Sequence, residues 1–323
     1  MKLAALSGIA LLVAACPGDG AQVEPPPYTP FAVLDTTLVP PFDADSAHAL
    51  LRRQVAFGPR VPGMPGHAAQ LAWMTAFLRE RADTLIVQDF THETAGPSFG
   101  RGGERTTLRM TNLFARFNPT ATTRILLLAH WDTRPTADMD SERDDEPIPG
   151  ANDGASGTAV LLELANVLSR HSAPIGVDIL LVDGEDYGPG SRDMYLGAKH
   201  FAATFNTYRP LYGILVDMVG DQQPEYPIEG NSQRYAPEVV ERVWKTAELL
   251  GLGQYFPRTN GGEITDDHVP LNQAGIRTIN IIDFDYGPGN RFWHTHEDSV
   301  ENTSPLGLGV VGRVLATLIY TGG

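Results

Sequence analysis

Imidazole and carboxylate side chains recur in six short segments of this 323-residue chain. Small, aromatic or acidic neighbours surround each of them. Neutral imidazole and carboxylate groups suit Zn²⁺, which takes three protein ligands and one open position in catalytic sites. The pattern therefore indicates a catalytic zinc centre assembled from distant parts of the chain. The segments are residues 130–132, 150–157, 184–186, 217–218, 265–268 and 293–296.

Other chemistries find little support in the sequence. The single cysteine, Cys16, excludes a disulfide framework, a zinc finger and a CxxC redox pair. Ser156 lies in a GASG segment that lacks the GxSxG spacing of a nucleophile elbow. The chain contains neither a P-loop nor a GxGxxG motif after a strand, so nucleotide cofactors are not expected. Metal-assisted chemistry remains.

Four residues stand out within the six segments. Asp153 lies among Gly and Ala directly before an expected helix, where it is either a metal ligand or an N-cap. Glu185 and Asp186 are adjacent acids at an expected strand end, where they either serve a site or form a solvated loop. His294 lies between Trp293 and a threonine in a Gly-rich, aromatic loop. Their joint occurrence favours the site over the structural alternatives.

Hydrophobic patterning predicts the elements that must position these side chains. Short apolar runs predict strands buried on both faces, and alternating segments predict two further strands. Buried strands that alternate with helices indicate a single α/β domain with a mostly parallel (mixed) central sheet flanked by helices. Open α/β sheets place their sites at the carboxyl ends of the strands. Strands are expected at 85–90, 107–117, 125–129, 177–182, 212–216 and 276–282, and helices at 43–57, 66–82, 158–169, 237–250 and 305–320.

In this order the six segments resemble the M28 zinc-peptidase superfamily, and within it the bacterial glutaminyl cyclases. The resemblance spans roughly residues 45–321. It implies a zinc-exopeptidase-like fold and a glutaminyl-peptide cyclotransferase, which converts the N-terminal Gln of peptides or proteins to pyroglutamate and releases ammonia. It also implies one zinc ion held by Asp153, Asp186 and His294. Animal cyclases carry Glu at the position of Asp186, so the shorter side chain must bring its loop closer to the metal.

The resemblance also implies roles for residues around the metal. It makes Glu185 the proton shuttle, and it makes Asp217 and Asp266 a hydrogen-bonded carboxylate pair beside the site. Trp293 is implied as an aromatic side chain that contacts substrate. Further residues are expected to bind substrate: Trp131 and His268, with Tyr187 or Tyr195 in place of a second stacking aromatic.

Two other functions stay open at this stage. M28 aminopeptidases use two zinc ions, and a second site here would draw on His130 and Asp217 with Asp153 as the bridge. Asp266 argues for one ion, because two close carboxylates share a proton instead of both ionising, unless Asp266 only caps the helix that follows. A non-catalytic peptide-binding lipoprotein is the remaining alternative, and the intact ligand set argues against it.

The N-terminus predicts export. Residues 1–15 read as a lipoprotein signal peptide, and Cys16 as a lipidated N-terminus of the mature protein. Residues 16–30 read as a Pro/Gly-rich tether, and 31–323 as the cyclase-like domain. We expect a protein anchored by lipid in the bacterial envelope, with the outer membrane or periplasm favoured. The formal net charge of −15 makes nucleic acid an unlikely partner, peptide N-termini are the expected substrates, and a monomer is favoured.

Overall fold

A computed structural model describes residues 35–94 and 106–322. These residues belong to one compact unit, Phe31–Gly323. The predictions for the signal peptide, Cys16 and the tether lie outside the described residues.

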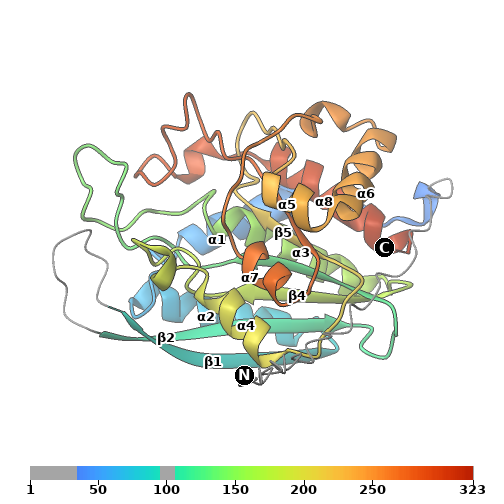
Figure 1. Ribbon diagram of the computed structural model, residues 1–323, viewed down its shortest axis with the longest axis horizontal. Helices are drawn as coiled ribbons and strands as arrows, with labels where there is room; N and C mark the ends of the chain where they lie inside the picture. Colours follow the sequence, from blue (N-terminus) through green and yellow to red (C-terminus); the bar gives the residue numbers. More distant parts are fainter. Residues whose placement is uncertain (1–34, 95–105, 323) are drawn as a thin grey trace, which may run out of the picture. The chain divides into compact units, whose positions relative to one another are not determined.

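Six strands form one mixed sheet in the order β1-β2-β4-β3-β5-β6 (Figure 1). The pairs β4–β3, β3–β5 and β5–β6 are parallel, and β1–β2 and β2–β4 are antiparallel. The expected single α/β domain with a mixed central sheet is confirmed. The strands are β1 (Thr84–Thr94), β2 (Thr106–Phe117), β3 (Arg124–His130), β4 (Gly176–Val182), β5 (Gly213–Asp217) and β6 (Thr278–Ile282).

Helices cover both faces of this sheet. The larger hydrophobic core joins one face to five long helices, and a smaller core joins the other face to two shorter ones. The first group is α1 (Ala44–Val55), α2 (Pro65–Arg79), α3 (Ala155–Arg170), α6 (Pro237–Leu249) and α8 (Pro305–Tyr320). The second is α4 (Leu196–Thr204) and α7 (His268–Gln273), while α5 (Gly230–Tyr235) packs beside β6. Four 3₁₀ turns span Thr36–Leu38, Ser191–Asp193, Gly253–Tyr255 and Val300–Asn302.

The apolar run of β3 explains why this strand is central. Ile125, Leu127 and Ala129 belong to the larger core, and Leu126 and Leu128 to the smaller one. Side chains alternate across a strand, so a strand covered on both faces must be apolar at every position. All seven residues of β3 are buried.

The carboxyl ends of β3 and β5 mark the place where the chain changes direction across the sheet. From β3 the chain crosses through α3 to β4 on one side, and β5 then returns to the other side of β3. Such a reversal of strand order opens a crevice at the carboxyl ends of the two strands. His130 ends β3 and Asp217 ends β5, so both flank this crevice.

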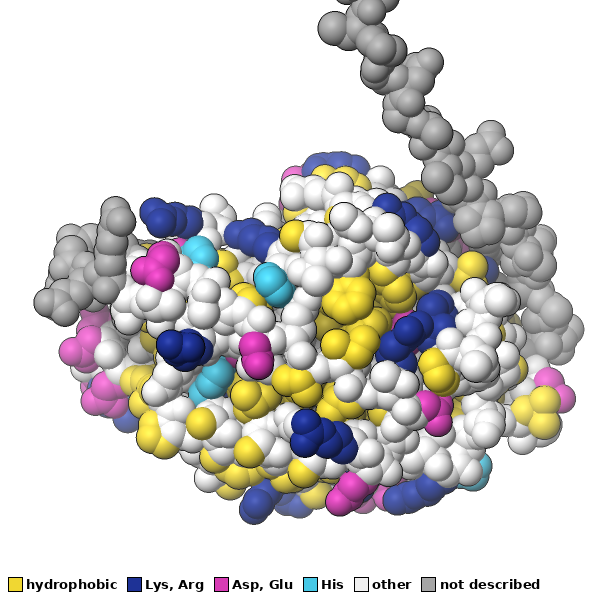
Figure 2. All heavy atoms as spheres, turned by 90° about the horizontal axis from the view of Figure 1, so that it is seen from below, with side chains coloured by type: hydrophobic (Ala, Val, Ile, Leu, Met, Phe, Trp, Pro, Cys, Tyr) yellow, Lys and Arg dark blue, Asp and Glu magenta, His cyan; other side chains and the backbone are white. Residues whose placement is uncertain are grey.

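Two further features of the described residues concern their helices and their surface charge. None of their helices is long and apolar enough to cross a membrane. The face drawn in Figure 2 carries basic and acidic side chains scattered among hydrophobic ones, and its basic side chains do not form one continuous patch.

Candidate active site

A pocket of about 380 Å³ opens at the carboxyl ends of β3, β4, β5 and β6. It brings together residues from five of the six predicted segments, which lie up to 141 positions apart in the sequence. Its lining combines acids, one histidine and apolar side chains. The lining residues are Arg134, Asp138, Asp153, Glu185, Asp186, Met194, Tyr195, Asp217, Met218, Glu263, Ile264, Thr265, Asp266, Ile282, Phe284, Trp293 and His294.

Asp153, Asp186 and His294 form one group that could hold a metal ion. His294 Nε2 lies 3.6 Å from Asp186 Oδ2 and 3.7 Å from Asp153 Oδ2, which is too far for hydrogen bonds. Ligand atoms about 2.0–2.1 Å from a tetrahedral zinc ion lie roughly 3.3 Å from one another. Asp186 Oδ2 is buried without a hydrogen-bond partner. The donor types, the spacing and this unpaired oxygen all fit Zn²⁺.

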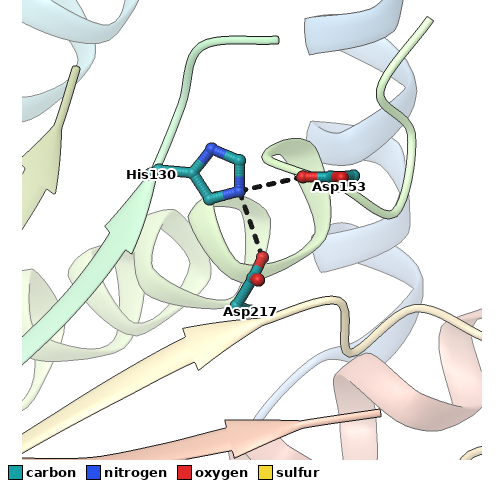
Figure 3. A group of neighbouring side chains, drawn as sticks. All are labelled: His130, Asp153 and Asp217. Atoms are coloured by element: carbon teal, nitrogen blue, oxygen red, sulfur yellow. Dashed lines mark hydrogen bonds and ion pairs between the residues drawn. The ribbon is translucent and has the colours of Figure 1, made fainter. Parts of the chain in front are cut away.

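His130, Asp153 and Asp217 form a second such group (Figure 3). His130 Nε2 lies 3.1 Å from Asp153 Oδ1 and 3.1 Å from Asp217 Oδ1, so here the side chains contact one another directly. Burial would lower the pKa of His130, but the carboxylates of Asp217, Asp132 and Asp153 raise it well above its usual value. Asp153 belongs to both groups, with one oxygen toward each.

Two buried aspartates hold the loops that carry the acidic ligands. The backbone N–H groups of Glu185 and Asp186 donate to Asp132, at 3.1 and 3.2 Å. In the same way, those of Asn152 and Asp153 donate to Asp298, at 2.7 and 3.2 Å. The N-cap position of α3 is occupied by the next residue, Gly154, so Asp153 is not a helix cap and its carboxylate is available to the site.

Arg134 and Asp138 connect two of the candidate metal ligands, Asp186 and His294. Arg134 donates from Nε and Nη2 to the two oxygens of Asp138, at 2.7 and 3.1 Å, and from Nη1 to Asp186 Oδ1. Asp138 Oδ1 also lies 3.0 Å from His294 Nδ1. An imidazole that contacts a carboxylate through one nitrogen presents the other nitrogen to a metal.

Glu185 lies beside these groups and is 7 % exposed. Burial raises its pKa well above the usual value, and the nearby charges of Asp186, Asp266 and Asp267 raise it further, while His130 lowers it. A carboxyl group with a raised pKa can both accept and return a proton near neutral pH. Glu185 also lines the pocket, so a group bound there could exchange a proton with it.

Asp217 and Asp266, the predicted carboxylate pair, both line the pocket. Asp217 Oδ1 contacts His130, whereas Asp266 accepts from the amide of Asn280 at 2.7 Å and from the backbone N–H of Asp267 at 2.6 Å. The two acids interact through their charges: burial, and then Asp217, raises the pKa of Asp266 to about 7. Asp217 thus contacts His130, the residue expected beside it in the second metal site of an aminopeptidase.

Trp131 and His268 do not line the pocket, which corrects their prediction as substrate-binding residues. Both are fully buried. Trp131 stacks on His67 and donates its ring N–H to the Thr111 carbonyl at 3.2 Å. His268 opens α7 and contacts Glu229 through Nε2 at 3.1 Å. The expected motifs are present, but these two side chains point into the core.

Aromatic side chains at the pocket come from other positions. Trp293 lines it, and its ring stacks on that of His294 with centroids 3.7 Å apart. Of the two tyrosines considered from the sequence, Tyr195 lines the pocket, whereas Tyr187 packs in a small apolar cluster. Tyr195, Met218 and His294 have φ of 59°, 49° and 55°, a left-handed region that side-chain-bearing residues rarely adopt. Strain of this kind concentrates at functional sites.

Three residues that shape the site were not predicted as site residues. Arg134, Asp138 and Asp298 contact candidate ligands or their loops, yet as single charged residues in polar loops they resemble ordinary surface positions. Their only signal in the sequence is proximity, because Arg134 and Asp138 follow His130 within eight residues and Asp298 follows His294 by four. Asp132 lies in a predicted segment, but its contact with the Glu185 backbone was not predicted.

The chain is similar to named glutaminyl cyclases and to a named aminopeptidase. Glutaminyl-peptide cyclotransferase from Bos taurus is 27% identical over 298 residues, which cover 80% of this chain and 77% of that protein. The crystal structure of Bacteroides thetaiotaomicron glutaminyl cyclase bound to N-acetylhistamine has 36% identity and a TM-score of 0.79, and covers 87% of this chain and 99% of that chain. A structure described as a leucine aminopeptidase precursor from B. thetaiotaomicron VPI-5482 is as similar, with 36% identity, a TM-score of 0.79, and coverage of 87% and 98%.

The family follows from a match over most of the domain. A model described as Peptidase family M28 matches residues 112–319, which include every ligand and pocket residue discussed above. The chain is a member of peptidase family M28.

Proposed function

We propose that this protein is a zinc-dependent glutaminyl-peptide cyclotransferase. The carrying observation is the placement of Glu185, a buried carboxyl group with a raised pKa, in the same pocket as Asp153, Asp186 and His294. Cyclisation of an N-terminal glutamine needs one group that polarises the side-chain carbonyl and one that moves a proton from nitrogen to nitrogen. The similarity to named cyclases supports the same reaction.

Zinc held by Asp153, Asp186 and His294 would act as a Lewis acid on the glutamine side-chain carbonyl. The pocket orients the substrate so that its own α-amine reaches that carbon, and intramolecular ring closure makes orientation the main contribution. A C–N bond forms to the α-nitrogen and the C–N bond to the amide nitrogen breaks. Glu185 accepts a proton from the α-amine and donates it to the departing ammonia.

The remaining residues assist this transfer. Asp217 and Asp266 lie on the pocket wall, and the charge of Asp266 helps to keep the pKa of Glu185 high. Trp293, already stacked on His294, offers an aromatic surface to the glutamine side chain. In this proposal both acids and Trp293 act on bound substrate without holding the metal.

The number of metal ions separates this function from its closest rival. A di-zinc aminopeptidase is favoured by one observation: His130, Asp153 and Asp217 could hold a second ion. The 3.1 Å contacts of His130 with both acids argue for one ion, because the three side chains already pair with one another. We therefore propose one zinc ion per chain.

A mass-spectrometric assay tests the function. Purified zinc-loaded protein is given one peptide that begins with Gln and another that begins with Leu. The expected result is loss of one ammonia from the first peptide and no change in the second. Removal of the first residue from either peptide would establish an aminopeptidase instead, and zinc-loaded protein that changes neither peptide would contradict the cyclase.

We further propose that the protein acts on peptide or protein N-termini in the bacterial envelope as a monomer, anchored through lipid on Cys16. The apolar run before Cys16 and the tether after it support this location. Replacing Cys16 with Ser should move the protein from the membrane fraction to the soluble fraction. Unchanged fractionation of the variant would contradict the lipid anchor.

A further inference from the structure

One cation lies directly against the proposed metal site. Arg134 is 4 % exposed, and two of its nitrogens donate hydrogen bonds to the two oxygens of Asp138. A third nitrogen, Nη1, donates to Asp186 Oδ1. A Cβ atom built on Gly188 would lie 2.9 Å from this same nitrogen, so the guanidinium is also enclosed by backbone. Arg134 therefore has one orientation, and that orientation occupies one oxygen of a metal-binding carboxylate.

Asp138 extends this contact to a second metal-binding side chain. Its Oδ1 receives Arg134 Nε and also lies 3.0 Å from His294 Nδ1. The backbone of the same loop is tied to the same residue, because the N–H of Met139 donates to the His294 carbonyl at 3.3 Å. One loop, residues 134–139, thus joins the ligand that follows β4 to the ligand that follows β6.

We propose that Arg134 and Asp138 are positioning residues that set the coordination number and the strength of the metal site. With Oδ1 held by Arg134, Asp186 can offer the ion only Oδ2, the oxygen that is buried without a partner. The site then supplies one imidazole nitrogen and two single carboxylate oxygens. Three such ligands and one open position suit a four-coordinate ion such as Zn²⁺, and they disfavour Ca²⁺, which takes six to eight oxygens.

The two residues act in different ways, so they have different signatures. Loss of Arg134 frees Asp186 Oδ1, and both oxygens can then bind the ion, which raises its coordination number. Loss of Asp138 releases the His294 ring, and residues that orient a metal-binding histidine typically contribute about 10–100-fold to metal affinity. Neither effect requires turnover, so both can be measured without substrate.

The test uses the detergent-purified full chain, stripped of metal and titrated with Co²⁺ or Zn²⁺. Four-coordinate Co²⁺ absorbs visible light far more strongly than five- or six-coordinate Co²⁺. We expect Arg134→Gln to lower this absorbance several-fold, and Arg134→Lys, which cannot grip both acids, to lower it in part. We expect Asp138→Ala to weaken zinc binding about 10–100-fold in competition with a chelator, and Asp138→Asn, which keeps an acceptor oxygen, to recover part of the loss.

Arg143→Gln is the matched control. Arg143 lies a few residues after Met139 and forms an exposed ion pair with Glu146 at 3.7 Å. It should match the parent protein in both measurements. Thermal melting of each metal-free variant shows that it is folded, and Arg134→Lys carries the test if Arg134→Gln is not. A parental Co²⁺ spectrum in the folded Arg134 variants, or zinc affinity within twofold of the parent in Asp138→Ala, would overturn the proposal. It rests on the metal site of the proposed function, and the peptide assay tests the reaction separately.

Discussion

The two groups of side chains that share Asp153 contain the same residue types, two aspartates and one histidine, but differ in how closely these side chains contact one another. Around His294 the nitrogen–oxygen distances are 3.6 and 3.7 Å, and Asp186 Oδ2 has no partner. Around His130 the corresponding distances are 3.1 Å, and the imidazole connects both acids. An unpaired buried carboxylate oxygen is costly unless something binds it. Spacing, and not residue type, thus separates the group that we propose holds the ion from the group whose side chains already contact one another.

The candidate ligands of the His294 group also differ in how they are held. His294 and Asp186 are held by side chains, through Asp138 and Arg134. The shared ligand Asp153 is held through its backbone by Asp298. Each of these supports can be altered by a single substitution, so their effects on metal binding and stability can be measured separately.

The largest expected effect concerns the reaction beside the His294 group. Glu185→Gln removes the proton carrier without removing a ligand, so turnover of a Gln-peptide should fall at least about 1000-fold. Bound zinc, measured by elemental analysis, should stay at the parental level. Turnover near that of the parent would show that the acid–base group lies elsewhere.

The second prediction contrasts the two histidines. His294→Gln should weaken zinc binding by more than about 100-fold, because it removes a ligand. Loss of a residue that only orients a ligand already weakens metal binding by up to about 100-fold. His130→Gln keeps a side chain that can donate to Asp153 Oδ1, so zinc affinity should fall by less than about tenfold, the lower end of the range for residues that orient a ligand. Chelator competition measures both. Equal losses in the two variants would indicate that both groups hold metal, as in an aminopeptidase.

The third prediction concerns the backbone supports. Asp298→Asn replaces an oxygen that accepts a backbone N–H with an amide that donates, so one of two buried N–H groups loses its partner. The free energy of unfolding should fall by about 1–3 kcal/mol, measured by urea denaturation. Asp144→Asn, at an exposed position of the loop between β3 and α3, serves as the control and should change it by less than about 1 kcal/mol. A loss of equal size in the control would mean that the backbone bonds of Asp298 are unimportant.

The smallest expected effect separates two tryptophans. Trp293 lines the pocket and Trp131 lies in the core. Trp293→Leu should raise KM for a Gln-peptide by about 2–10-fold, because aromatic contacts contribute about 0.5–1.5 kcal/mol beyond the area they bury. Trp131→Phe should leave KM unchanged and lower only stability. A raised KM in Trp131→Phe would restore its predicted contact with substrate.

Several elements could be predicted from sequence because each depends on local patterning. Continuous apolar runs located β3 and β4 within one residue at either end, and the last helix matches its prediction from Pro305 to Tyr320. The short helices α4, α5 and α7 were missed, since six to nine residues give too little periodicity to stand out. The first turn of α3 was also missed, because its small residues, starting at Ala155, resemble a loop.

Patterning along the chain was enough to predict which side chains gather at the strand ends, because the carboxyl ends of parallel strands must share one edge of a sheet. It did so for Asp153, Glu185, Asp186, Asp217 and His294, all of which line the site. Only the tertiary structure decided their pairings: Asp217 with His130, Arg134 with Asp186, and Asp138 with His294. These contacts depend on the orientation of side chains across different loops, at a resolution of tenths of an ångström, and no local pattern in the sequence records it.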